Sequence, residues 1–228
     1  MMACVSALDG HLRSAAIYIA VAAVFDLLDG MVARALGVSG PLGKQLDSLA
    51  DMVSFGVAPA LIARESILKA LYMNTGEIAI QGLERLLPFL PLVLVACSAL
   101  RLARFNLDDS QAVDFKGLPT PANALFWISI PFSTSTSGWL LLQDLLQNPY
   151  VLGGLCIVMS LLLVSSTRLL SMKIDRQDVI RSRWQFVLII GGAILFSLFR
   201  FAALPFIIVL YLLLSLIRNT TLKHEIQS

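Results

Sequence analysis

The sequence predicts an all-α polytopic membrane protein, and its composition and hydropathy are the observations that predict it. Hydrophobic residues make up 57% of the 228 residues and charged residues only 14%, and the mean hydropathy is +0.82. Soluble domains carry about 25% charged residues. Apolar stretches of about 20 residues, the length that crosses a bilayer as a helix, recur along the chain. We expect one transmembrane bundle over residues 1–228, with about eight helices of which the first is truncated.

The first half of the chain contains three of the expected spans. Residues 1–8 are apolar but too short to cross a bilayer, so we expect them to end a truncated first helix. Residues 15–36 form the next predicted span, and the turn over residues 37–41 breaks it because Gly and Pro interrupt helices. Residues 42–72 and 86–107 are the following two predicted spans.

The second half contains four more, which makes seven complete spans in all. Residues 122–142 are expected to cross with a kink at Pro131. Residues 150–170 form the next span. Residues 184–217 are long enough only for two short crossings, with a turn near residues 200–205.

The lysines and arginines are distributed unequally between the two sides of the predicted bundle. Twelve of the seventeen lie at loop ends near residues 34–44, 101–116, 168–183 and 218–223. The other five are Arg13, Arg64, Lys69, Arg85 and Arg200. The positive-inside rule places the larger group in the cytoplasm. We therefore expect the larger basic side of the protein to face the cytoplasm.

Four aspartates interrupt the apolar sequence between residues 25 and 51. Asp26 and Asp29 are three residues apart, and Asp47 and Asp51 are four apart. Both spacings place side chains on one face of a helix. The intervening turn folds the second helix back against the first, so all four carboxylates can meet. Ionised carboxylates at membrane depth are costly unless they are paired or bind a cation, which indicates a functional site.

The residue types in this stretch indicate the cation. Carboxylate oxygens suit Mg²⁺, Mn²⁺ or Ca²⁺, and zinc is disfavoured because both histidines, His11 and His224, and all three cysteines lie outside the stretch. Four carboxylates suffice for two metal ions with shared ligands. Such a pair can clamp a pyrophosphate for in-line displacement at phosphorus.

The neighbours of the aspartates fit a diphosphate ligand. Gly30 and Gly43 lack side chains and allow a ligand to approach the backbone, while Ala33 keeps the adjoining surface open. Arg34 can pair with phosphate oxygens, and Lys44 supplies a further positive charge.

Two other interpretations of the aspartates remain open at this point. A cation transporter also uses intramembrane acids, although it explains the aspartates and not the neighbouring Gly, Arg and Lys. A purely structural role would pair the aspartates with Arg34 and Lys44, which leaves four acids against two local cations.

The whole stretch resembles the motif of the CDP-alcohol phosphotransferase family, D-x2-D-G-x2-A-R-x8-G-x3-D-x3-D. The positions are filled by Asp26, Asp29, Gly30, Ala33, Arg34, Gly43, Asp47 and Asp51. The resemblance implies a membrane enzyme, typically homodimeric, that moves a phosphoalcohol group from a CDP-linked donor to an acceptor hydroxyl and releases CMP. It implies no nucleic-acid partner.

The resemblance also implies roles for the individual residues. The first three aspartates hold one divalent ion, Mg²⁺ or Mn²⁺, and the first, third and fourth hold a second. Asp51 is implied to be the base that deprotonates the acceptor. The glycines and the arginine of the motif contact the nucleotide and its phosphates.

Three further segments resemble phosphatidylserine synthases of the membrane-embedded type: DSLADMVSFGVAPA (47–60), RLARFN (101–106) and FKGLPTPAN (115–123). They imply CDP-diacylglycerol as donor, L-serine as acceptor and the bacterial inner membrane as the location, with the active site facing the cytoplasm. Glycerol phosphate or inositol phosphate remains an alternative acceptor within the family.

The acceptor site is expected near the second of these segments. Arg101 and Arg104, three residues apart at the end of a span, could receive the serine carboxylate or the lipid phosphate. Asn106 could add a hydrogen bond, and Ser54 is a weaker candidate. Anchoring by the positive-inside rule is the alternative for the arginines, and turn geometry is the alternative for residues 117–121.

The chain departs from the family pattern at its start. Members usually begin with a complete first helix, whereas this sequence starts at MMACVSALDG, apparently midway through it. We expect the contacts that this helix makes with the nucleotide to be absent here.

Overall fold

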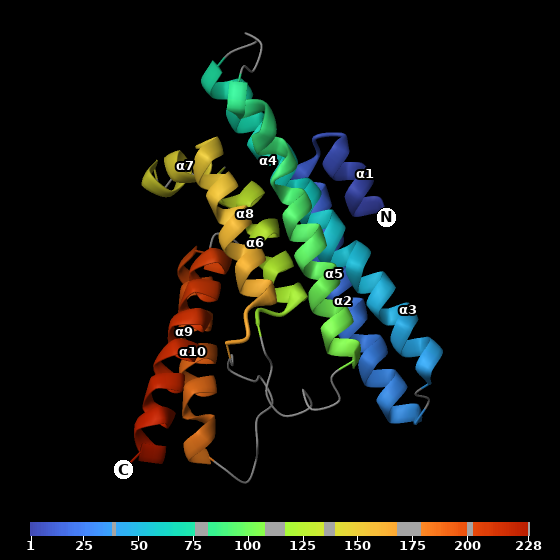
Figure 1. Ribbon diagram of the computed structural model, residues 1–228, viewed down its shortest axis with the longest axis vertical. Coiled ribbons are helices and arrows are strands. Elements are labelled where there is room, and N and C mark those ends of the chain that lie inside the picture. Colours follow the sequence, from blue (N-terminus) through green and yellow to red (C-terminus); the bar gives the residue numbers. More distant parts are fainter. Residues whose placement is uncertain are drawn as a thin grey trace.

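The computed structural model describes residues 1–37, 40–75, 82–107, 117–134, 140–167, 179–199 and 203–227. All regular structure in these ranges is helical, which confirms the predicted all-α fold class. Figure 1 shows a bundle in which the first helices lie at one flank, the last two at the other, and α6 and α8 between them.

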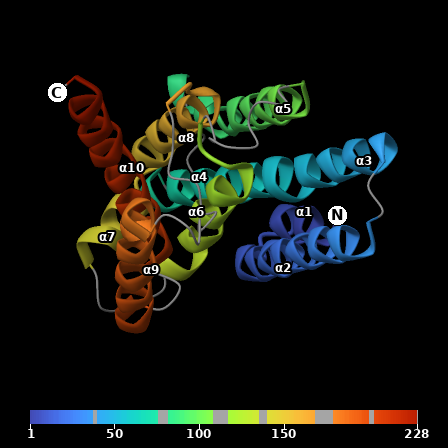
Figure 2. The ribbon, with the colours of Figure 1, turned by 90° about the horizontal axis from the view of Figure 1, so that it is seen from below.

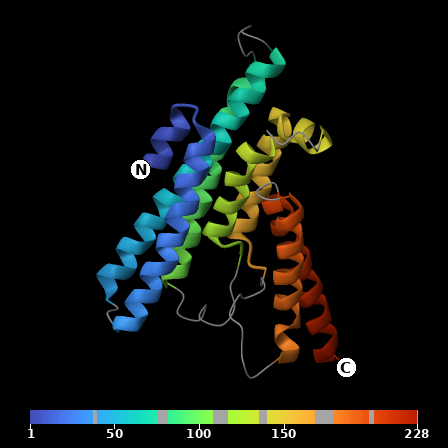
Figure 3. The ribbon, with the colours of Figure 1, turned by 180° about the vertical axis from the view of Figure 1, so that it is seen from behind.

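The N-terminal flank is built from two antiparallel arms. Helix α1 (Met2–Leu8) packs on α2 (Leu12–Leu36). Gly37 then adopts a left-handed φ of +66°, a conformation that glycine adopts without strain. Gly40 is the N-cap of the next helix and Pro41 its first residue. This confirms the predicted break and folds the following arm back along α2 (Figure 3).

The returning arm is one continuous helical rod with a single π-helical segment between two α-helices. It consists of α3 (Pro41–Asp51), the π-helix η1 (Met52–Val57) and α4 (Ala58–Thr75). A 3-10 helix, η2 (Gly82–Phe89), follows and leads into α5 (Pro91–Leu107). The prediction of spans over 42–72 and 86–107 is thus right in place, although the winding of each is not uniform.

Helix α6 (Thr120–Ser133) is the centre of the bundle. Most of its side chains are buried, and it packs against α2, α4 and α10 (Figure 2). The expectation of one continuous span over 122–142 is wrong, because α6 ends at Ser133 and a separate short helix, α7 (Leu140–Leu146), follows. Pro131 lies in the last turn and removes one intrahelical hydrogen bond, which weakens the helix near this end.

The remaining helices cover α6. Helix α8 (Pro149–Val164) packs along α5, and its N-cap Asn148 accepts hydrogen bonds from the backbone N–H groups of Tyr150 and Val151. Helices α9 (Val179–Phe199) and α10 (Leu204–Gln227) form an antiparallel pair. Their boundary confirms the predicted division of residues 184–217.

The lengths of the apolar helical stretches agree with those of an integral membrane protein. Within the described ranges, three stretches are long and apolar enough to cross a membrane: Leu12–Ala33, Leu42–Met73 and Glu84–Leu107. Shorter apolar helical stretches occupy Pro149–Val164, Phe186–Leu198 and Leu204–Ser215. The predicted number of seven complete spans remains a prediction.

The segment before α6 is tied to the end of α8 by backbone hydrogen bonds. The N–H of Gly117 donates to the Thr167 carbonyl at 3.0 Å, and the N–H of Leu118 donates to the Leu162 carbonyl at 2.9 Å. Gly117 has a φ of +75°, and a Cβ atom there would lie 2.7 Å from the carbonyl oxygens of Leu163 and Ser165. Turn geometry therefore accounts for this glycine, and any larger residue meets rigid backbone.

Replacing Gly117 by alanine is expected to destabilise the protein by more than about 1 kcal/mol, because the substitution combines a strained φ with a backbone clash. The measurement is the thermal unfolding midpoint of the purified protein in detergent. Gly154→Ala is the matched control: Gly154 is an exposed position within α8 with no atom near its would-be Cβ, so its midpoint should be unchanged or higher. Equal midpoints for the two variants would contradict the prediction.

Candidate active site

Three aspartates from the two antiparallel arms meet at one point. Asp26 extends from α2, and Asp47 and Asp51 extend from α3. One carboxylate oxygen of each lies within 4.8 Å of those of the other two. Asp26 and Asp51 are half-buried and Asp47 is exposed, so the cluster opens toward solvent on one side.

The fourth predicted aspartate lies next to this cluster. Asp29 is exposed, one turn after Asp26 on α2, and is not among the three that converge most closely. It still interacts electrostatically with Asp26, Asp47 and Asp51. The like charges repel one another, and a divalent cation among them would offset that repulsion.

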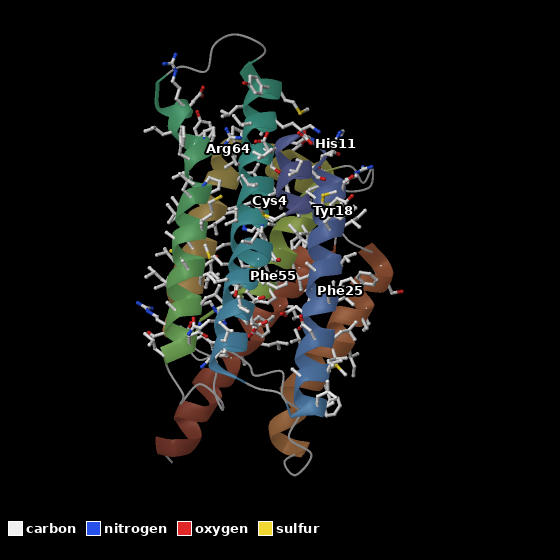
Figure 4. All side chains as sticks on the ribbon, turned by 90° about the vertical axis from the view of Figure 1, so that its right-hand side faces the viewer. Cys4, His11, Tyr18, Phe25, Phe55 and Arg64 are labelled. Atoms are coloured by element: carbon white, nitrogen blue, oxygen red, sulfur yellow. The ribbon has the colours of Figure 1, made fainter. Side chains whose placement is uncertain are left out.

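The π-helical turn begins directly after Asp51. Its Phe55 is buried, and Gly56 packs tightly on α5: a Cβ atom on Gly56 would lie 3.2 Å from the Cβ of Ser98. Such π-turns are often found at functional sites. The turn brings the end of α3 against α5 and so sets the position of Asp51 in the bundle. Figure 4 shows Phe25 and Phe55 on neighbouring arms beside this region.

A hydrogen-bond network joins α3 to the end of α5. The Lys44 ammonium donates to the Asn106 carbonyl at 3.2 Å. The Asn106 amide donates to the Ser48 hydroxyl at 2.8 Å, and that hydroxyl also lies 3.0 Å from the Lys44 carbonyl. Lys44 and Asn106 were predicted to bind ligand groups, and here they hold the helix that carries Asp47 and Asp51.

Arg101 is the cation whose electrostatic interaction with Asp51 is established among the described residues. The two side chains attract each other electrostatically. The Arg101 guanidinium also donates to the Thr120 hydroxyl at 3.1 Å, and its buried Nε has no hydrogen-bond partner in the described structure. Thr120 is fully buried at the start of α6. Arg101 is thus held at the edge of the carboxylate cluster with donor capacity to spare.

The other predicted site residues fall into three situations. Arg104 donates to the Val164 carbonyl at 3.1 Å, which caps the end of α8. Ser54 is half-buried on the π-turn. Gly30, Ala33 and Arg34 continue α2 beyond Asp26, Gly43 has open space where a Cβ would lie, and the side chain of Arg34 is outside the described residues.

Two positioning residues escaped the sequence analysis. Ser48 holds Asn106, and Thr120 holds Arg101. Both are small hydroxyl residues inside the segments 47–60 and 115–123, and their contacts with Asn106 and Arg101 arise only when distant helices pair. The one signal for Thr120 was its place in GLPTP, which also fits a turn.

The fold and the cluster together define a helical membrane protein with an aspartate site of the kind that holds divalent cations. The chain belongs to the CDP-alcohol phosphatidyltransferase family, whose sequence model matches residues 1–164. That match includes all four aspartates and confirms the resemblance found in the sequence. Proteins of this family depend on a divalent metal ion.

The names of three curated relatives of the chain all refer to serine. The chain is 40% identical over 121 residues to an archaetidylserine synthase of Methanothermobacter thermautotrophicus, an alignment covering 52% of this chain and 46% of that protein. CDP-diacylglycerol–serine O-phosphatidyltransferases of Mycobacterium leprae and Bacillus subtilis are 39% and 32% identical, covering 54% and 58% of this chain and 39% and 68% of those proteins. The chain thus spans less than half the length of the first two. No solved structure matches it.

Replacing Asp47 by asparagine removes one of the converging negative charges. We expect a higher unfolding midpoint in the presence of a chelator, because repulsion within the cluster falls, together with Mn²⁺ affinity that is at least about tenfold weaker. Thermal unfolding with and without Mn²⁺ measures both effects.

Asp144→Asn is the control for this substitution, since Asp144 is an exposed aspartate of α7 outside the cluster. It should leave both quantities unchanged. Unaltered stabilisation by Mn²⁺ in the Asp47 variant would contradict the assignment of this aspartate as a ligand.

Proposed function

We propose that this protein transfers the phosphatidyl group of CDP-diacylglycerol to the hydroxyl of L-serine, giving phosphatidylserine and CMP. The observation that carries the proposal is the convergence of Asp26, Asp47 and Asp51 at the meeting point of two antiparallel arms, within the motif of its family. The names of the relatives support serine as the acceptor.

The residues present fit the divalent ions that this chemistry uses. Three carboxylates with oxygens within 4.8 Å of one another, and Asp29 beside them, form a hard oxygen donor set. Asp26, Asp29, Asp47 and Asp51 would hold two ions, Mg²⁺ or Mn²⁺. When bound, the ions neutralise the diphosphate and stabilise the charge that develops on the departing CMP.

The chain's own groups bind the donor and move one proton. Gly43 leaves open space beside α3, and Gly30 and Arg34 follow Asp26 on α2; we assign the nucleotide and its phosphates to these residues. Asp51 takes the proton of the serine hydroxyl. The serine oxygen forms a bond to the phosphorus that carries diacylglycerol, the phosphoanhydride bond breaks, and CMP leaves with the electron pair.

Arg101 is the residue best placed for the acceptor. It is near Asp51, and part of its guanidinium has no partner in the described structure. A serine carboxylate bound there would bring the serine hydroxyl toward Asp51. Thr120 positions Arg101 for this role, whereas the contact of Arg104 with Val164 favours a structural task.

The proposal includes a membrane orientation and an assembly. Lys44, Arg101 and Arg104, three described members of the larger basic group, lie at the same end of the bundle as the cluster. This end faces the cytoplasm, where CDP-linked lipid and serine meet. The protein acts as a homodimer in the cell membrane.

The deciding experiment measures CMP release by the purified protein with CDP-diacylglycerol, Mn²⁺ or Mg²⁺, and a panel of alcohols. We expect release with L-serine and none with glycerol 3-phosphate or inositol phosphate. Asp51→Asn should lower the rate at least about 100-fold, because it removes the base and one metal ligand.

Release only with another alcohol would overturn the choice of serine but not the enzyme class. Absence of CMP with every acceptor, with ion flux in its place, would favour a cation transporter. Normal turnover by the Asp51 variant would disprove its role as the base.

Thr120→Val removes the hydroxyl that holds Arg101 while keeping the shape of the side chain. We expect KM for L-serine to rise roughly tenfold, the value of one charge-assisted hydrogen bond, with little change in the Mn²⁺ requirement. Steady-state CMP release measures both. Thr134→Val, which alters a threonine at the other end of α6, is the control and should leave KM for serine unchanged. Equal KM values for the two variants would contradict the positioning role.

A further inference from the structure

We propose a second ligand site, for the phosphate headgroup and one acyl chain of an anionic phospholipid, at the end of the bundle opposite the aspartate cluster. A cavity of about 420 Å³ lies there between the start of α2, the end of α4 and the end of α6. Its polar lining includes His11, Arg13, Ser66, Lys69, Thr134 and Gln147. This site is independent of the proposed catalytic function.

The cavity is well separated from the carboxylates. Arg13 is near the first residue of α2 and Asp26 is thirteen residues further on, which corresponds to about 20 Å along the helix axis. Figure 4 shows His11 and Arg64 at the upper end of the molecule, away from Phe25 and Phe55. A ligand in this cavity therefore does not touch the carboxylate cluster.

The charge of the cavity selects an anion. Arg13 extends from α2 and Lys69 from α4, so two cations from separate helices line one space. Neither has a carboxylate partner within the described part of the chain. The nearby acid Glu65 accepts a hydrogen bond from its neighbour Arg64 and forms an ion pair with it. A phosphate group would supply the missing counter-charge and accept charge-assisted hydrogen bonds.

The neighbouring groove indicates that the anion carries an acyl chain. A second cavity of about 430 Å³ adjoins the first, and both are lined by Gly10, Leu12, Lys69 and Met73. Leu68, Tyr72 and Glu65 complete its lining, and the Glu65 carboxylate is already paired with Arg64. A cavity lined by cations that continues into an apolar groove fits a phospholipid, because the anionic phosphate of a phospholipid is joined to an apolar acyl chain. Inorganic phosphate would fill only the first cavity.

The position of these basic residues supports the same conclusion. Arg13 and Lys69 belong to the minority of lysines and arginines at the end away from the main basic group. Tyrosine at the mouth of the groove is typical of a membrane interface. The alternative is that each cation extends independently from its own helix toward the membrane interface. That alternative does not explain why both cations line one cavity beside an apolar groove.

The test measures lipid binding to the purified full chain in detergent. A chelator is present so that the aspartate cluster stays free of metal and repels the anionic lipid, which leaves the second site to bind it. Dioleoylphosphatidylglycerol, dioleoylphosphatidylcholine and inorganic phosphate are added separately. Native mass spectrometry and the thermal unfolding midpoint report binding. We expect phosphatidylglycerol to bind and raise the midpoint, and the other two to have little effect.

The double variant Arg13→Gln, Lys69→Gln should bind phosphatidylglycerol at least about tenfold more weakly. The charge-conserving Arg13→Lys, Lys69→Arg variant should retain binding, and this separates loss of charge from loss of fold. Arg85→Gln removes a cation that does not line the cavity and is the control. Undiminished binding by the double glutamine variant would overturn the site, and equal stabilisation by inorganic phosphate would overturn the lipid as its ligand.

Discussion

The convergence of like-charged carboxylates within an apolar protein is the constraint on which the rest of the structure depends. Three carboxylates, those of Asp26, Asp47 and Asp51, have oxygens within 4.8 Å of one another. The nearby carboxylate of Asp29 adds further electrostatic repulsion. Such an arrangement repels itself and persists only because the surrounding helices hold it. The repulsion is also what suits the cluster to divalent cations, so the local instability and the proposed chemistry have one cause.

The helices that hold the cluster do so with few polar contacts. The turn at Gly37 and Pro41 reverses the chain so that the rod returns along α2, and the π-turn after Asp51 packs the rod onto α5 at Gly56. Asn106 and Arg101, from the end of α5, then bind Ser48 and Thr120 on two different helices. The end of α5 therefore connects the helix that carries Asp47 and Asp51 to the buried helix α6.

The two ends of the bundle differ in chemistry. One end carries the aspartates together with Lys44, Arg101 and Arg104, and a charged nucleotide group is the ligand proposed for it. The other end offers a cavity lined by Arg13 and Lys69 next to an apolar groove. Helix α2, the α3–α4 rod and α6 each contribute residues at both ends, so the two proposed ligand sites share these helices.

The sequence by itself determined the all-α membrane class, the break after α2, the division between α9 and α10 and the meeting of the aspartates. Each follows from local rules: apolar length, Gly and Pro, and helical spacing. Only the tertiary structure decided that α6 ends at Ser133, that Ser48 and Thr120 hold Asn106 and Arg101, and that Arg13 and Lys69 share a cavity. These depend on contacts between helices far apart in the chain, which no local spacing encodes.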